Sequence, residues 1–292
     1  MQERSQGLRE LCGLLGYSSQ AYYQYNRQTE KRAFRQEELI QQVLEHRRLQ
    51  PRLGTRKLLE LMQPEMGRDA FFELLRDNGL LVRRKRYRAR TTFSSHRFRK
   101  YPDLVKYLVA ERPNQLWVSD ITYIRIKQDF AYLSLVTDAY SRKIIGFFMS
   151  HDLSTDNCLG ALRMALASRL TTDQPLIHHS DRGTQYCSKA YTGLLKRKGI
   201  AISMTQSGNP RDNAIAERVN GILKMELLKE SYDHISAAYQ DVKQAIAVYN
   251  KLRPHSSLDM LTPESAHQKT GTIIRRWRNY YPQREMEAAI DR

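Results

Sequence analysis

The sequence predicts a mixed α/β core, a five-stranded sheet covered by helices, preceded by an all-α region. Amphipathic stretches separated by glycines in the first 81 residues are typical of short helices. Residues 114–152 contain three successive runs rich in β-branched and aromatic residues, as in an antiparallel meander. After residue 154 helical and strand patterns alternate, and strands followed by αβ units predict a mixed sheet with helices on its faces.

The charge of the chain indicates a polyanionic partner. Lys and Arg number 48 against 31 Asp and Glu, a net charge of +17, which favours nucleic acid or an acidic membrane surface. Residues 1–100 hold 22 of these cations against 11 acids, so the first third is the expected DNA anchor. The sequence has no apolar run of membrane-spanning length and begins with a charged stretch, so we expect a cytoplasmic, nucleoid-associated protein without a membrane partner.

Two helical DNA-binding elements are expected in the N-terminal region. Over residues 1–30, a helix that ends at Gly16 and a second that Ser18 or Ser19 caps fit a helix-turn-helix. A second helical domain is expected over 31–81, with helices at 37–49, 54–62 and 67–79. The alternative is that these helices only pack on one another, and the excess of positive charge favours DNA binding instead.

A basic linker is expected over residues 82–112. From Val82 to Lys100 the chain has nine Lys or Arg, no acid and interleaved aromatic residues, a composition suited to neutralising phosphates and stacking on bases. The alternative is a solvated surface, which the absence of acids disfavours. The linker residues expected to bind DNA are Arg83, Arg84, Lys85 and Arg86. A catalytic core over 113–270 and a basic tail over 271–292 complete the predicted organisation.

Three carboxylates fall inside predicted elements of the core, where an unpaired charge is costly to bury. Asp120 lies in the first strand, Asp181 at the end of the fourth, and Glu217 in the helix after the fifth. Alone, each is better explained as a surface carboxylate or a cap. Together they predict a site for Mg²⁺ or Mn²⁺, since two ions held by shared carboxylates stabilise the attacking and leaving oxygens in phosphoryl transfer. We expect all three at one edge of the sheet, with Glu217 displaced when metal is absent.

The helix that carries Glu217 has two chemically different sides. Asn213, Glu217, Asn220 and Lys224 fall on one stripe, which any surface helix can show, and the opposite side is apolar. We expect the apolar side to pack on the sheet and the polar stripe to contact DNA. Lys224 lies about two helical turns from Glu217, a reach suited to a phosphate near the scissile bond.

The residues that flank Asp181 suggest further contacts. Arg182 and Gln185 follow it on a loop where Gly183 permits close backbone approach, so we predict that they bind DNA, with simple turn chemistry an equal alternative. His178 and His179 are adjacent on a strand and point to opposite faces, which argues against a shared zinc ion. The three cysteines are widely spaced and indicate neither disulfides nor a zinc site.

Three strings resemble the catalytic core of the retroviral-integrase superfamily, in which two Asp and one Glu form a triad: LWVSDITYI, HHSDRGTQY and NPRDNAIAERVNGILKMEL. Asp181 and Glu217 enclose 35 residues, the spacing of that superfamily. The tail YNKLRPHSSLDMLTPESAH and the paired N-terminal helices extend the likeness over nearly the whole chain. The chain thus resembles the second-frame protein of a bacterial insertion-sequence family whose transposase is encoded in two overlapping frames.

The resemblance implies an RNase H-like integrase core and DNA cleavage and strand transfer at the ends of a mobile element. Asp120, Asp181 and Glu217 are then the catalytic residues and the ligands of two Mg²⁺ or Mn²⁺ ions per active site. Terminal inverted repeats and target DNA are the implied partners, bound by a homo-oligomer, a dimer or higher, in the bacterial cell. A DNA-contacting Lys is implied at the position of Lys224. The His and Cys zinc cluster of retroviral integrases is absent from the sequence, and whether an upstream-frame partner is needed stays open.

Two other functions fit part of the sequence. A DNA-binding regulator with a catalytically silent core accounts for the charge and the helix pairs, but leaves the three carboxylates unexplained. An RNase H-like nuclease without strand joining accounts for the carboxylates, and an assay for joined products separates it from a transposase. The 17 Tyr leave a Tyr nucleophile open, although no matching constellation of Arg, His and Tyr stands out.

Overall fold

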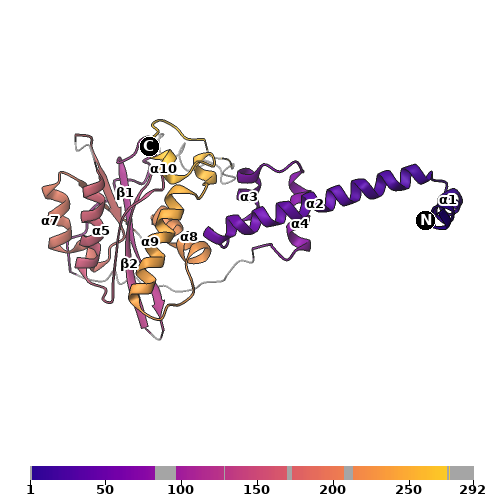
Figure 1. Ribbon diagram of the computed structural model, residues 1–292. Helices are drawn as coiled ribbons and strands as arrows, with labels where there is room; N and C mark the ends of the chain where they lie inside the picture. The colour runs from indigo at the N-terminus through magenta and orange to yellow at the C-terminus, as the bar shows by residue number, and fades with distance from the viewer. Residues whose placement is uncertain are drawn as a thin grey trace. The chain divides into compact units, whose positions relative to one another are not determined.

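The computed structural model describes residues 2–82, 97–127, 129–169, 173–206, 213–274 and 276. The chain divides into two compact units, residues 1–83 and 84–292, each considered by itself (Figure 1). None of the helices in the described ranges is long and apolar enough to cross a membrane.

The N-terminal unit is helical, as predicted, but its second helix is far longer than expected. After α1 (Gln2–Leu14), the Ser18 hydroxyl accepts a hydrogen bond from the Ala21 amide and caps α2 (Ser19–Leu49). The predicted boundary between residues 30 and 31 falls inside α2, and the separate helix predicted at 37–49 is part of it. The reason is that α2 contains neither glycine nor proline, the residues that interrupt helices. Pro51 follows the helix and favours its end, because the residue before a proline avoids the α conformation.

Two shorter helices complete this unit where the sequence predicts them. Helices α3 (Thr55–Met62) and α4 (Arg68–Asp77) each follow a glycine, Gly54 and Gly67. They pack with the C-terminal part of α2, whose one buried residue is Val43. The cluster that joins the three helices consists of Val43, Leu53, Leu58, Phe71 and Leu75.

The C-terminal unit is built on a five-stranded sheet in the order β3-β2-β1-β4-β5. Strands β1 (Leu116–Ile126), β2 (Asp129–Asp138) and β3 (Ile144–Ser150) form the predicted antiparallel meander. On the other side of β1, β4 (Ile177–Ser180) and β5 (Ala201–Met204) pair in parallel. This mixed topology is that of the predicted RNase H-like core.

Helices cover both faces of this sheet (Figure 1). An apolar cluster around Trp117 and Leu162 joins one face to α5 and α7, and a second around Leu133 and Tyr249 joins the other face to α8 and α9. The remaining elements are short. The bounds are α5 (Thr155–Ser168), α6 (Thr184–Cys187), α7 (Lys189–Arg197), α8 (Ala214–Ile222), α9 (Ile235–Lys251), the 3₁₀ turn η3 (Ser256–Leu258) and α10 (Pro263–Ala266).

Helix α8, which carries Glu217, continues into the π-helical turn η2 (Leu223–Leu227). A π-helical turn widens the helix and rotates the side chains that follow it, and such turns are frequent at functional sites. Lys224 lies within this turn.

The second half of the predicted linker packs on the core unit. Tyr101 packs against the Trp117 cluster, and the Pro102 carbonyl accepts a hydrogen bond from the Met204 amide at the edge strand β5. Val105 and Leu108 pack beside Leu116 in a third apolar cluster of this unit, at the start of β1. Tyr101, Val105 and Leu108 thus attach this stretch to the core, because their apolar side chains are partly removed from water. Leu104, Tyr107 and Val109 stay exposed.

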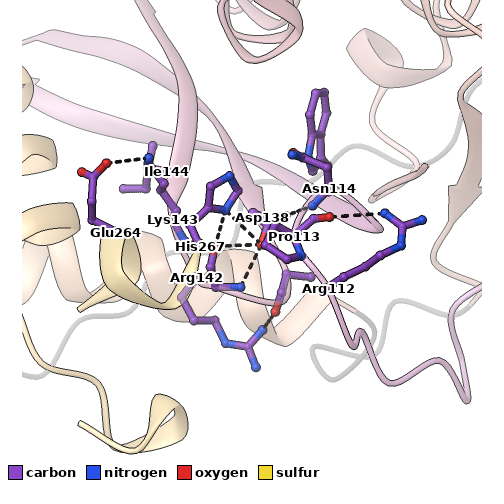
Figure 2. A network of polar contacts seen from close by, with 12 residues as sticks. Arg112, Pro113, Asn114, Asp138, Arg142, Lys143, Ile144, Glu264 and His267 are labelled. Atoms are coloured by element: carbon purple, nitrogen blue, oxygen red, sulfur yellow. Dashed lines mark hydrogen bonds and ion pairs between the residues drawn. The ribbon is translucent and has the colours of Figure 1, made fainter. Parts of the chain in front are cut away.

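A buried carboxylate fastens the C-terminal segment to the turn between β2 and β3 (Figure 2). Asp138 is fully buried and accepts hydrogen bonds from the Asn114 amide and from the amide and hydroxyl of Ser141, at 2.7 to 2.8 Å. His267 Nδ1 lies 2.9 Å from the Ser141 hydroxyl. Because β2 pairs with β1, these contacts tie the segment after α9 to the neighbour of the strand that carries Asp120.

Candidate active site

The register of two parallel strands brings Asp120 and Asp181 together. Val118 of β1 pairs with His179 of β4, and each aspartate lies two residues farther along its strand direction. Since side chains two residues apart along an extended chain share one face, both carboxylates emerge on the same side at neighbouring positions. The sequence predicts this pair, and the strand register accounts for it.

Both carboxylate oxygens of Asp120 accept hydrogen bonds. The Asn220 side-chain amide donates to Oδ2 at 2.8 Å, and the Ile121 backbone amide donates to Oδ1 at 2.9 Å. Burial and then the charge of Asp181 raise the pKa of Asp120 to about 7, with a smaller contribution from Glu217, although the two hydrogen bonds oppose this rise. Asp181 therefore lies near enough to interact electrostatically with the other two carboxylates.

Asp181 is held by the loop that follows it. The Gly183 amide donates to Oδ1 of Asp181 at 2.9 Å. A Cβ at position 183 would lie 3.0 Å from that oxygen and 3.2 Å from Oε1 of Gln185, closer than ordinary contacts. A side chain at this position would have to shift these two side-chain oxygens by a few tenths of an ångström, so the glycine leaves room for the Asp181 carboxylate.

Glu217 lies on the exposed side of α8. Partial burial and then the charge of Asp181 raise its pKa. Within the ranges that the structure describes, no three acidic, His or Cys side chains form a cluster able to hold one metal ion. The carboxylates are near enough to repel one another without forming a closed coordination shell.

Asn213 and Asn220 face the sheet, which differs from the predicted contact with DNA. Both are buried, and the Asn213 side-chain amide donates to the Ser119 carbonyl at 2.9 Å, next to the bond from Asn220 to Asp120. These two members of the polar stripe lie against β1 because that strand offers them a carbonyl and a carboxylate as hydrogen-bond acceptors. These two amides hold α8 on the strand of Asp120.

Lys224 also reaches β1. Its Nζ lies 3.2 Å from the Thr122 hydroxyl and 4.2 Å from the centre of the Tyr123 ring. Burial lowers the pKa of Lys224 to about 8, and the negative charge of Asp120 opposes the change. The ammonium therefore lies near the carboxylates, at the expected end of the polar stripe.

The other predicted DNA contacts have varied surroundings. Arg182 and Gln185 are half-buried, and the Gln185 side-chain amide donates to the Leu153 carbonyl at 3.1 Å, so it also connects α6 to the segment before α5. The linker residues Arg83, Arg84, Lys85 and Arg86 lie outside the described residues.

The adjacent histidines are structural. His178 Nε2 lies 2.8 Å from the Ser119 hydroxyl and 2.9 Å from the Tyr191 hydroxyl, and burial lowers the pKa of His178 to about 3. His179 Nδ1 lies 2.8 Å from the Ser203 hydroxyl. Both are buried and contact different partners, which agrees with the alternation of side chains along a strand.

Sequence reasoning missed two features of the site. Thr122, the partner of Lys224, carries no signal in the sequence beyond its strand position. The π-helical turn after α8 is joined to the end of α9 by a buried ion pair between Glu226 and Arg253. The string RPHSS contains that arginine, but no local pattern identifies an acid 27 residues earlier as its partner.

Comparison with known proteins gives consistent matches over most of the chain. Two family models described as "Integrase core domain" match residues 110–210 and 198–263. The uncharacterized 31 kDa protein of insertion element IS600 from Shigella sonnei is 32% identical over 267 residues, which covers 89% of this chain and 98% of that relative. The putative transposase of insertion sequence element IS986/IS6110 from Mycobacterium tuberculosis is 31% identical over 280 residues, which covers 92% of this chain and 97% of the relative.

Among solved structures, the HTLV-2 integrase catalytic core domain in complex with magnesium is similar at a TM-score of 0.43 and 17% identity, over 55% of this chain and 100% of that domain.

Proposed function

Because this chain belongs to the integrase-core transposases of bacterial insertion sequences, we propose that Asp120, Asp181 and Glu217 carry the catalysis of its DNA transposition. The observation that supports this assignment is the parallel register of β1 and β4, which sets two aspartates side by side where Glu217 adds a third interacting charge. Enzymes of this family are polynucleotidyl transferases.

The residues present fit a divalent cation. Asp120 and Asp181 supply hard oxygen donors, and their mutual repulsion favours binding of Mg²⁺ or Mn²⁺, which prefer such ligands. Glu217 would complete the ligand set by turning inward from its exposed position. Two bound ions would stabilise negative charge on the attacking and leaving oxygens of the phosphodiester.

The chain's own residues position these groups and the DNA. Asn220 orients Asp120, Gly183 fixes Asp181, and Lys224 offers a positive charge to a phosphate beside the scissile bond. In cleavage, a water oxygen forms a bond to phosphorus as the bond to the 3′ oxygen breaks and that oxygen gains a proton. In joining, the freed 3′ hydroxyl forms the new bond to a target phosphate and the target's own 3′ oxygen leaves, so no external energy source is needed.

The element's terminal repeats and target DNA are the proposed substrates, handled by a homo-oligomer in the cytoplasm. The helices α2, α3 and α4, with two helices joined by a short turn, suit a helix-turn-helix anchor, and the basic stretch with Arg83, Arg84, Lys85 and Arg86 suits phosphate contact. Arg182 and Gln185 remain proposed contacts near the reacting strand.

The test is cleavage and joining of a labelled element-end duplex by the full chain in Mg²⁺, with binding measured in parallel. Asp120→Asn should abolish both reactions and leave affinity for the duplex within about twofold, because the anchor lies in the other unit. The matched control is Asp129→Asn, an exposed carboxylate at the start of β2, which should react as the wild type. Active Asp120→Asn protein would reject the assignment, and cleavage without joined products would favour a nuclease.

A further inference from the structure

Two acid-free basic segments, far apart in sequence, have described parts that meet at one edge of the sheet, near Tyr101 and β5. Residues 78–102 and 182–211 contain no Asp or Glu, and they contain nine and six Lys or Arg, respectively. The second segment runs from the residue after Asp181 through α7 and β5. Such long acid-free stretches are unusual in a chain that is 27% charged residues.

Tyr101 lies where the two segments meet. The Arg99 guanidinium carbon lies 5.4 Å and the Lys196 ammonium 5.5 Å from the centre of its ring, so one aromatic ring is shared by a cation from each segment. Two hydrogen bonds fix the chain around Tyr101 on β5. The Met204 amide donates to the Pro102 carbonyl, and the Leu104 amide donates to the Ser203 hydroxyl. These contacts between the two segments therefore belong to the folded core unit.

The cations at this junction are exposed and lack acidic partners among the described residues. No ion pair with a described residue involves any of them. The nearest acid in the sequence, Asp103, accepts a hydrogen bond from the Val105 amide. We define the β5-edge face by the two cations on the Tyr101 ring, Arg99 and Lys196, together with the exposed cations next to them in sequence, Arg97, Lys100, Arg197 and Lys198.

The β5-edge face leads toward the carboxylates. Burial and then Asp181 raise the pKa of the Cys187 thiol in α6, and the positive charges of Lys100 and Arg182 oppose that rise. Lys100 and Arg182 therefore lie near the same thiol, and Arg182 adjoins Asp181 in sequence. Positive charge thus continues from the edge of β5 to the loop beside the site.

We propose that the β5-edge face binds the target DNA duplex, through its phosphates and without regard to sequence. Like charges gathered without acids repel one another, and a polyanion relieves that repulsion. Lys and Arg can contact the phosphates of any duplex, and phosphate contacts carry no direct sequence information, which suits DNA of no fixed sequence. This proposal rests on the proposed function and names the place where one of its two DNA substrates binds.

The test compares two triple variants. The β5-edge variant carries Lys196→Gln, Arg197→Gln and Lys198→Gln. The matched control carries Arg163→Gln, Lys243→Gln and Lys251→Gln. The control removes the same number of Lys and Arg from α5 and α9. With equal thermal stability, the β5-edge variant should keep element-end cleavage within about twofold and lose about tenfold in joining to plasmid DNA. Its plot of log affinity against log salt for an unrelated duplex should become shallower by about 2 to 3, since each phosphate contact contributes about 0.9.

The outcomes separate the alternatives. Equal losses of cleavage and joining would overturn the proposal in favour of binding to the element end. Wild-type joining and an unchanged salt slope would show a solvated surface and overturn it as well. The slope of log affinity against log salt is a binding measurement and does not depend on catalysis. If the Asp120→Asn protein were active, the proposed function would be rejected, but the slope would still decide whether the β5-edge face binds DNA.

Discussion

Arg253 and Glu226 form a bidentate ion pair that joins the end of α9 to the π-helical turn. Arg253 Nε donates to Oε2 of Glu226 and Nη2 donates to Oε1, each at 2.9 Å. The arginine side chain is 2% exposed and the glutamate 22%, so water screens this pair little. Because Lys224 lies in the same turn, the pair fixes the backbone from which that lysine reaches β1.

Removing one partner of this pair should destabilise the core unit strongly. Arg253→Met leaves Glu226 without its partner, and the expected loss of unfolding free energy is about 3 to 5 kcal/mol. Chemical denaturation of the single variants and of Arg253→Met combined with Glu226→Leu measures the coupling. The double variant should recover much of the loss. Additive losses would show that the two residues act separately.

The metal-free protein should lose stability as pH rises from about 4 to about 7 because of Asp120. Its folded-state pKa is about 7, above the unfolded value of about 3.9, so in this window the native state binds the extra proton. Asp120→Asn removes this proton linkage and should raise the melting temperature at pH 8 by about 2 to 4 °C per kcal/mol gained. Melting in EDTA at pH 5 and pH 8 tests this, with Asp129→Asn as control. A wild-type difference between the two pH values equal to that of Asp120→Asn would contradict it.

Asn220→Ala should impair the chemical step more than DNA binding. The side chain is buried and donates to Asp120, and removal of a residue that orients a metal ligand typically costs about 10- to 100-fold. Cleavage under single-turnover conditions should slow by about that factor, with element-end affinity unchanged. A loss of affinity with normal cleavage of the bound duplex would instead support the direct DNA contact that the helix stripe suggests.

Lys224 should make end cleavage sensitive to alkaline pH. Its pKa is lowered to about 8, so the ammonium that attracts phosphate is lost as pH rises through that value. Lys224→Ala should reduce cleavage and joining more than overall affinity, and Lys224→Arg, which stays protonated, should retain activity at pH 9 relative to pH 7 better than the wild type. Cleavage profiles from pH 7 to 9.5 measure this. Identical profiles for wild type and Lys224→Arg would show that this amine has no such role.

The sequence predicts the elements of the core well because local chemistry specifies them. The runs that form β1, β2 and β3 are rich in the β-branched and aromatic residues that favour strands. Ser154 and Gly67 are the N-cap residues of α5 and α4. Asp120 and Asp181 could be predicted as a pair because each lies in or beside a strand, where burying an unpaired charge is costly.

Features that depend on which elements meet could not be predicted in this way. The polar stripe of α8 gives the direction of Asn213 and Asn220 but not the surface opposite them, which is β1. The division expected between residues 30 and 31 has no glycine or proline nearby to enforce it, and the backbone continues through it as α2.

The uninterrupted α2 sets a fixed length within the N-terminal unit. Val43 lies 24 residues after Ser19, about 36 Å along the helix at about 1.5 Å per residue, and it is where α3 and α4 pack on α2. One turn of B-form DNA is about 34 to 36 Å. A terminal repeat touched at both ends of this helix would therefore present its two contact points about ten base pairs apart, on the same side of the duplex. Inserting or deleting a few residues within α2 would change that phase as well as the distance.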